Sequence, residues 1–243
     1  MQRYLLFSCS ILAYLSAMVS LTLLILWVYP WPFMPINIDT NVGGSGALFV
    51  DIALLALFGL QHSVMARPAF KEAVFDRLPA SLRSSTYTLL SSLCIFLILW
   101  LWQPLGGTVF AFESGPLYWA MTLLYFGGWG LAFVATFQID HFELFGLHQG
   151  YRAFKGLREP DVRFQKKGFY RSVRHPVQTG TMLGLWATPV MSTGHLLFCA
   201  GLTLYILIGL KLEERDLLKS LGEAYERYRL EVPMLLPLRK KRP

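Results

Sequence analysis

Long apolar runs, separated by polar segments, make up about half of this chain. Four of the runs are long enough to cross a bilayer as helices, because a hydrocarbon core needs about 20 residues of helix. They lie near residues 8–29, 47–66, 86–103 and 116–138.

Two shorter apolar runs follow, near residues 176–192 and 195–212, on either side of a Ser-Thr-Gly break. Such a break predicts a tight helical hairpin that enters the bilayer and returns to the same side. Gly180 and Gly184 lie one helical turn apart in the first arm. This spacing of small residues predicts close packing against another helix.

The segment from Glu213 to Pro237 has the pattern of an amphipathic helix. Its apolar side chains recur every three or four residues, which places them on one helical face. They are Leu217, Leu221, Tyr225, Tyr228 and Val232. A helix of this kind packs against the lipid surface or the end of a bundle, so we expect it at the membrane surface.

The pattern as a whole predicts an all-α fold: a polytopic membrane helix bundle with four spans, a C-terminal transmembrane helical hairpin and a cytosolic amphipathic tail helix. Composition agrees, since 54% of the residues are hydrophobic, mean hydropathy is +0.45 and only 15% are charged. Soluble domains average roughly 25% charged residues. We divide the chain into a four-helix half, residues 1–138, and residues 139–243, which carry the polar connection, the hairpin and the tail.

All 22 Lys and Arg residues fall on one side of this topology. The connections 30–46 and 104–115 contain none, whereas 67–85, 139–175 and the tail from Lys211 contain four, eight and nine, and one more precedes the first span. Because cytoplasmic loops are enriched in these residues, we expect a bacterial inner-membrane protein with both termini in the cytoplasm. The net charge of +7 is interpreted as a topology signal with some attraction to anionic lipid, and nucleic acid is not expected as a partner.

Cationic and acidic groups meet at one predicted membrane level. FYRSVRHPVQTG, residues 169–180, places Arg174 and His175 where the hairpin enters the bilayer, and KLEERD places Glu213 and Glu214 where it returns. Arginine binds carboxylates through paired hydrogen bonds, and aromatic rings attract cations such as a sulfonium. The cluster therefore suits a zwitterionic, partly aromatic ligand from the cytosol. Lipid anchoring by the arginines is the alternative interpretation.

RSVRHPVQTG, followed by the hairpin and by EERDLLKSLGEAYERYRLEVPMLLP, resembles the integral membrane methyltransferases typified by isoprenylcysteine carboxyl methyltransferase. The resemblance implies an enzyme that uses S-adenosylmethionine and releases S-adenosylhomocysteine. Together with the charged cluster, it predicts cofactor contacts from Val162, Arg163, Phe164, Gln165, Tyr170, Arg174, His175, Pro176, Gln178, Glu213, Glu214, Tyr225 and Tyr228.

Two features of the sequence narrow the choice of the methyl-accepting substrate. The prenylcysteine enzymes carry an arginine that faces the substrate carboxyl about one turn before the cofactor glutamate, and Gly209 stands there in this chain. Upstream, QIDHFELFGLHQGY, residues 138–151, resembles the bacterial methanethiol S-methyltransferases. That resemblance implies a small thiol substrate, methanethiol, and dimethyl sulfide as product.

A thiol reacts as its thiolate, so the predicted reaction requires a base or a site that favours the anion. Histidine titrates near neutral pH, and the candidate groups after the fourth span are Asp140, His141 and His148. Asp140 and His141 are neighbours whose side chains point apart in a helix, so we expect one of them to meet a residue from another helix, and His62 and Gln61 of the second span are the candidates. No His-x-x-x-His pair or carboxylate cluster with ligand spacing occurs, and a metal is not expected.

Three other functions fit the same pattern. A related methyltransferase could act on a prenylcysteine carboxylate or a lipid amine. A denitrification-associated membrane protein has a similar topology, and a non-enzymatic scaffold could use the basic surface to gather lipids or partners. The sequence has no signature of an oligomeric state.

Overall fold

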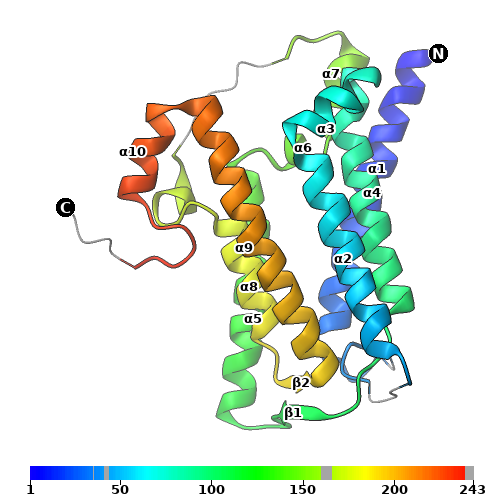
Figure 1. Ribbon diagram of the computed structural model, residues 1–243, viewed down its shortest axis with the longest axis vertical. Coiled ribbons are helices and arrows are strands. Elements are labelled where there is room, and N and C mark those ends of the chain that lie inside the picture. Colours follow the sequence, from blue (N-terminus) through cyan, green and yellow to red (C-terminus); the bar gives the residue numbers. More distant parts are fainter. Residues whose placement is uncertain (35, 41–43, 160–165, 239–243) are drawn as a thin grey trace.

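The computed structural model describes residues 1–34, 36–40, 44–159 and 166–238. Most of the described chain is helical (Figure 1). Its long helices are α1 (Gln2–Val28), α2 (Ala47–Ala66), α4 (Ala80–Leu101), α5 (Pro116–Gln138) and α9 (Thr193–Leu221). Its shorter elements are α3 (Pro68–Ala73), η1 (Phe75–Arg77), β1 (Thr108–Ala111), α6 (His141–Leu144), α7 (Leu147–Lys155), η2 (Gly168–Arg171), α8 (Pro176–Trp186), β2 (Val190–Ser192) and α10 (Glu223–Glu231).

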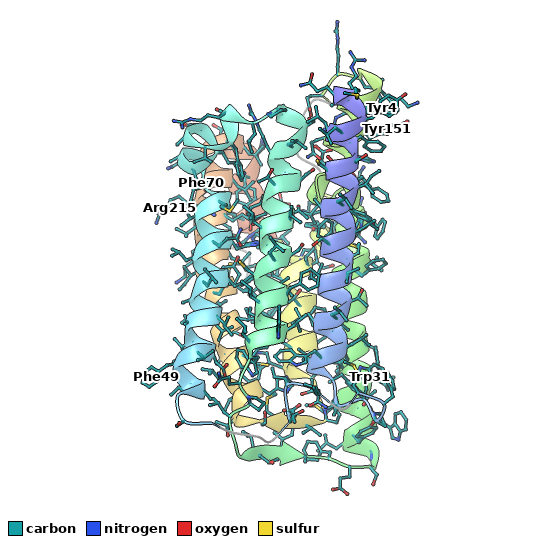
Figure 2. The ribbon with its side chains drawn as sticks, turned by 90° about the vertical axis from the view of Figure 1, so that its right-hand side faces the viewer. Tyr4, Trp31, Phe49, Phe70, Tyr151 and Arg215 are labelled. Atoms are coloured by element: carbon teal, nitrogen blue, oxygen red, sulfur yellow. The ribbon has the colours of Figure 1, made fainter. Side chains whose placement is uncertain are left out.

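The five long helices are apolar enough to cross a membrane, which confirms the four predicted spans and the second arm of the hairpin. Their outward faces carry many large apolar side chains, and such exposure is typical of contact with lipid. Tyr4 and Tyr151 lie at one end of the bundle, and Trp31 and Phe49 lie toward the other (Figure 2). Aromatic side chains at both ends fit the two interfaces of a bilayer. The chain is an integral membrane protein.

The predicted hairpin differs from the observed one at its turn. Helix α8 ends at Trp186 rather than near residue 192, because Pro189 has no amide hydrogen to donate and disfavours helix in the residue before it. Strand β2 follows and pairs antiparallel with β1, and this small ribbon was not predicted. The Ser-Thr-Gly segment is the start of α9, where the Ser192 side chain accepts from the amide of His195. With 11 residues, α8 rises only about 16 Å, so it crosses about half of a bilayer.

The predicted tail helix is broken into two pieces. Helix α9 continues to Leu221, Gly222 adopts a positive φ of 55°, and α10 begins after it. Glycine tolerates this conformation because it has no Cβ. The bend folds α10 back beside α9 (Figure 1). The predicted stripe nevertheless packs together, since Tyr225, Tyr228 and Val232 form one cluster with apolar side chains at the end of α9.

Helix α8 packs closely along α5 (Figure 1). A Cβ added at Gly180 would lie 2.5 Å from the backbone nitrogen of Ala132, and one at Gly128 would lie 2.5 Å from that of Gly184. The two backbones therefore touch, as the spacing of Gly180 and Gly184 predicts. This contact fixes the place where α8 begins, next to the end of α5.

The basic segments gather at one end of the bundle. Figure 1 shows the N-terminus, α3 and α7 at the end opposite the β1–β2 ribbon, and the α9–α10 bend lies toward the same end. The described connections at the ribbon end contain no Lys or Arg. The charge asymmetry of the sequence is thus also an asymmetry of the folded molecule.

We expect Gly180→Val to separate α5 from α8 and to lower the midpoint of thermal unfolding in detergent, because overpacking of this kind costs about 1–3 kcal/mol. Gly127→Ala on α5 is the control, since a Cβ there meets nothing within 4 Å. The control should keep or slightly raise the midpoint. An unchanged midpoint for Gly180→Val would contradict the close packing.

Candidate functional site

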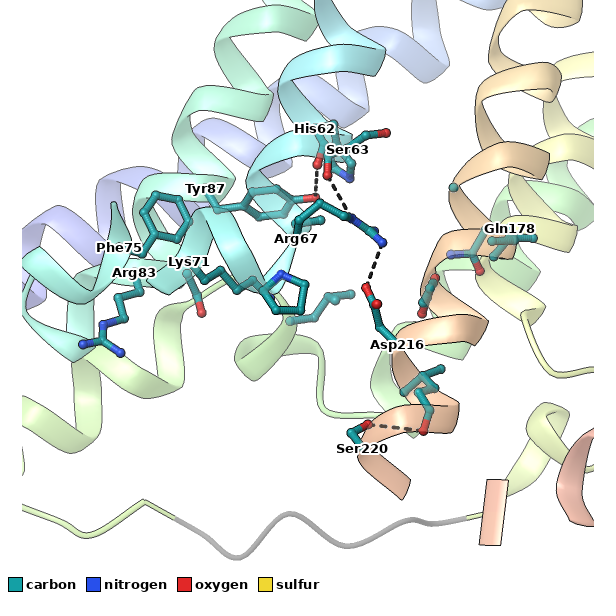
Figure 3. A pocket seen from close by; sticks show the side chains of 18 of the residues that line it. His62, Ser63, Arg67, Lys71, Phe75, Arg83, Tyr87, Gln178, Asp216 and Ser220 are labelled. Atoms are coloured by element: carbon teal, nitrogen blue, oxygen red, sulfur yellow. Dashed lines mark hydrogen bonds and ion pairs between the residues drawn. The ribbon is translucent and has the colours of Figure 1, made fainter. Parts of the chain in front are cut away.

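Two adjoining cavities open at the basic end of the bundle. The first, which we call the tail cavity, has a volume of about 890 Å³ and lies between the end of α5, α6, the start of α8, α9 and α10. The second, the His62 cavity, has a volume of about 770 Å³ and lies between α2, α3, α4 and α9 (Figure 3). Both volumes fall in the usual range of ligand sites. Four residues line both cavities: Leu144, Gln178, Glu213 and Leu217.

A buried ionic cluster forms one wall of the tail cavity. The guanidinium of Arg174 donates to Glu214 Oε1 at 2.6 Å, and His175 Nε2 lies 3.1 Å from the same oxygen. Arg174 also donates to the carbonyl oxygens of Arg229, at 3.2 Å, and Val232, at 2.5 Å. The side chains of Arg174 and Glu214 are 6% and 8% exposed. The two charges therefore satisfy each other, and they position the tail.

The chain after α10 lies directly against the start of α8. The amides of Arg174 and His175 donate to the carbonyls of Pro233 and Met234 at 2.9 and 3.1 Å. The hydroxyl of Thr179 donates to a further carbonyl of the same segment, 2.8 Å away. These bonds hold α10 over the tail cavity.

Glu213 differs sharply from its neighbour Glu214. One residue of helix turns a side chain by about 100°, so Glu213 points away from Arg174. It is exposed and lines both cavities. Among the described residues, no side chain forms an ion pair or hydrogen bond with it. An uncompensated carboxylate thus stands where the two cavities meet.

Three tyrosines face the tail cavity together with Glu213. The hydroxyl of Tyr228 donates to the carbonyl of Tyr170 at 2.7 Å, and the rings of Tyr225 and Tyr228 pack edge to face. Burial raises the pKa of Tyr228 to about 12 and also raises the pKa of Tyr170 and Tyr225. The three side chains are therefore neutral and offer aromatic faces.

His141 lies in the wall of the tail cavity, but both of its ring nitrogens have partners. Thr136 donates its proton to the carbonyl of Phe133 at 2.7 Å. Thr136 Oγ1 must therefore accept from His141 Nδ1, 2.8 Å away, which leaves Nε2 to accept from Tyr14 at 3.1 Å. The ring also stacks on Phe137 with 4.3 Å between centroids. Burial lowers the pKa of His141, and this geometry gives the neutral ring a packing role.

Asp140 meets His148, not His62. His148 Nδ1 lies 3.0 Å from Asp140 Oδ1, and both side chains are partly exposed. Asp140 has a φ of 81° and caps α6 by accepting from the amide of Glu143 at 3.0 Å. A non-glycine residue in this region is uncommon and strained, and the cap compensates for it.

His62 lies in the other cavity. Its Nδ1 is 3.1 Å from Ser91 Oγ, and its ring packs against Tyr87. The prediction that it meets Asp140 or His141 is wrong, because α2 packs against α4 and α9 rather than α6.

The described part of the chain contains one group of side chains with the spacing of metal ligands: Asp140, Glu143 and His148. Glu143, however, is held by both terminal nitrogens of Arg152 at 2.7 and 2.9 Å. Its charge is thereby compensated, and the group serves to cap α6 and join it to α7.

Other predicted contacts lie outside the cavities or outside the described residues. Pro176 is buried at the first position of α8 and lines neither cavity. Val162, Arg163, Phe164 and Gln165 lie outside the described residues.

One feature of the site was not predicted from the sequence: Arg67 and Asp216 form an ion pair of 2.8 Å that crosses the His62 cavity (Figure 3). A pair 149 residues apart leaves no local pattern in a sequence.

The five long helices and the two cavities define a polytopic membrane helix bundle with adjoining internal sites at its basic end. Residues 51–231 match the family described as NnrU protein. The chain therefore belongs to this family.

The chain is similar to several bacterial proteins over most of its length. Methanethiol S-methyltransferase 2 of Bradyrhizobium diazoefficiens is 45% identical over 208 residues, which cover 84% of this chain and 79% of that protein. Methanethiol S-methyltransferase of Pseudomonas deceptionensis is 44% identical, with 86% and 81% covered. The protein of that name from Crocosphaera subtropica is 42% identical, with 84% and 81% covered. No solved structure matches this chain.

We expect Glu214→Ala to release the tail, because removal of one partner leaves the Arg174 guanidinium buried and unpaired at a cost of about 3–5 kcal/mol. Limited proteolysis should then cut near α10 at protease concentrations that leave the wild type intact. Asp76→Ala is the control. It removes the ion pair of Arg83, in which the side chains are 39% and 51% exposed, and exposed pairs contribute about 0–1 kcal/mol. Equal protection of both variants would contradict the role of the buried pair.

Proposed function

We propose that this protein is a membrane methyltransferase that transfers the methyl group of S-adenosylmethionine to methanethiol. Dimethyl sulfide and S-adenosylhomocysteine are the products. The names of the bacterial relatives support this activity, and one structural observation carries it. Glu213 is an exposed carboxylate without a partner among the described residues, and it stands at the wall shared by two cavities.

The tail cavity fits S-adenosylmethionine. Bound there, this molecule supplies a methyl group on a positively charged sulfur. Glu213 can accept hydrogen bonds from its ammonium or its ribose hydroxyls, and Gln178 and His175 add polar groups. The faces of Tyr170, Tyr225 and Tyr228 suit an adenine or a sulfonium.

Arg174 and Glu214 act as positioning residues in this proposal. Their charges are engaged with each other and with tail carbonyls, so they hold the cavity wall in place and do not bind the ligand. The segment from Val162 to Gln165 remains a predicted contact. In this proposal residues 139–243, together with the end of α5, supply most of the site that binds S-adenosylmethionine.

The His62 cavity receives the acceptor. It shares Glu213 and Gln178 with the tail cavity, so molecules in the two cavities can approach each other. Transfer requires the reacting atoms to lie about 3–3.5 Å apart with water excluded. Gly209 also lines this cavity, and a Cβ added there meets nothing within 4 Å. The space that an arginine fills in the prenylcysteine enzymes is open here, which favours an acceptor without a carboxylate.

The reaction takes place at the cytosolic face of the bacterial inner membrane in this proposal, with both termini in the cytoplasm. The segments rich in Lys and Arg lie toward the end of the bundle that contains the cavities (Figure 1), which supports this orientation. S-adenosylmethionine is a cytosolic metabolite of high polarity, so its site must open to that side.

We expect Glu213→Gln to weaken S-adenosylmethionine binding roughly 10- to 100-fold, because a hydrogen bond to a charged group contributes about 1.5–3 kcal/mol. Isothermal titration calorimetry of the purified full chain in detergent measures this. Glu226→Gln, a change of the same kind on the exposed face of α10, is the control and should bind as the wild type does. Equal affinity of both variants for S-adenosylmethionine would contradict the proposal that Glu213 binds it.

We expect Gly209→Leu to raise the KM for methanethiol at least about tenfold while S-adenosylmethionine affinity stays unchanged, since the added atoms occupy the His62 cavity. A packing change worth about 1–3 kcal/mol supplies a factor of this size. Ile208→Phe, which adds bulk at a neighbouring position that is 51% exposed, should leave the KM unchanged. Release of dimethyl sulfide into the headspace measures both. A wild-type KM for Gly209→Leu would place the acceptor elsewhere.

A further inference from the structure

The ring of His62 is held in an aromatic box at the inner end of its cavity. Its centroid lies 4.8 Å from that of Tyr87, 5.3 Å from Phe58 and 5.9 Å from Tyr205. The box comes from α2, α4 and α9, which meet here. Three helices therefore fix the position of one imidazole.

Hydrogen bonds fix the tautomer of that imidazole. Ser91 Oγ donates its one proton to the carbonyl of Tyr87 at 2.9 Å, so toward His62 Nδ1, 3.1 Å away, it can only accept. Nδ1 must then carry the ring proton. In the neutral ring Nε2 consequently holds a lone pair.

Nε2 of His62 is open to the cavity. No described residue forms a hydrogen bond with it. It is also not one of the buried polar atoms without a partner, so it is accessible to solvent. His62 lines the His62 cavity (Figure 3), and Glu213 is another lining residue of the same cavity. His141 has no such free nitrogen, and His148 is partly exposed, pairs with Asp140 and lines neither cavity.

We infer that Nε2 of His62 is the base that takes the proton of the acceptor thiol. The inference rests on the proposed function. In this step the S–H bond breaks, a bond forms between the proton and Nε2, and the electron pair stays on sulfur as a thiolate. The ring becomes an imidazolium that still donates to Ser91 through Nδ1. Product release and loss of the proton to solvent through the open cavity restore the neutral ring.

The cavity chemistry is compatible with this step. An alkyl thiol is mostly protonated at neutral pH, since thiols titrate near pH 8.5 or above, and only the thiolate attacks. The titratable groups that line the cavity around His62 come from all the surrounding elements: Arg83 and Tyr87 from α4, Tyr205, Glu213 and Asp216 from α9, Arg67 after α2, Lys71 from α3 and Asp76 from η1. Asp216 is paired with Arg67, and Asp76 with Arg83. Among the described residues, Lys71 is then the cation of this cavity that has no ion-pair partner, and it favours a nearby anion, whereas the Glu213 carboxylate opposes one.

The decisive variant is His62→Asn. Asparagine can keep a donor to Ser91 and removes Nε2, so the fold is conserved while the base is lost. Loss of a general base lowers kcat by about 100-fold or more. The pH profile should also change: without a base the rate depends on thiolate in solution and rises tenfold per pH unit up to the pKa of the thiol. The wild-type rate should instead level off once His62 is neutral.

The assay uses full-length protein in detergent, methanethiol as acceptor and S-adenosylmethionine with a labelled methyl group. Gln61→Met is the control, because Gln61 also bonds to Ser91, at 3.4 Å, yet does not line the cavity. It should keep kcat and the wild-type pH profile. Calorimetry with S-adenosylmethionine checks that both variants are folded. Should His62→Asn fail this check, Ser91→Ala is the variant to use. Without Ser91 Oγ, nothing holds the ring proton of His62 on Nδ1, so kcat should fall, but by less than it does when the base is lost. The affinity for S-adenosylmethionine should stay unchanged.

Three results would overturn the inference. A His62→Asn protein with wild-type kcat and pH profile excludes His62 as the base, although the proposed function survives. If Ser91→Ala has to be used instead, a wild-type kcat for that variant likewise excludes His62 as the base. A wild-type protein that transfers no methyl group to methanethiol overturns the proposed function and the inference together.

Discussion

The ion pair between Arg174 and Glu214 is the constraint on which the basic end of this bundle depends. It joins the start of α8 to the end of α9 inside the protein, where separating two charges from water is costly. Carbonyl groups of the tail compensate part of that cost by accepting from the same guanidinium. The pair therefore requires the tail to return to α8. Once Glu214 is turned inward to meet Arg174, helical geometry turns Glu213 toward the cavities.

The arrangement that results has two cavities with one common wall. The tail closes one of them, and α2, α4 and α9 surround the other. In the proposed reaction this separation lets a large polar donor and a small thiol enter different spaces and meet near Glu213. The close packing of Gly128 against α8 contributes from a distance, since it sets the position where His175 begins the short helix.

Several local patterns gave wrong predictions, because a single residue within the pattern or a contact remote in sequence overrode it. The apolar run after Gly180 has the length of a longer helix, yet Pro189 stops α8 and the following strand pairs with β1 from another connection. The tail has the period of one helix, yet Gly222 bends it so that the same apolar stripe packs against α9. His141 has the chemistry of a base, but Thr136 and Tyr14 occupy both of its nitrogens.

The sequence by itself determined the membrane class, the spans, the side that carries the cations and the meeting of His175 with Glu213 at one cavity. These follow from hydrophobic length, charge asymmetry and the return of a hairpin, which are properties of neighbouring residues. Only the tertiary structure decided which of two adjacent glutamates is engaged, which histidine retains a free nitrogen and where the second cavity lies. Those outcomes depend on hydrogen-bond partners from other helices, and no local pattern specifies which helix will face which.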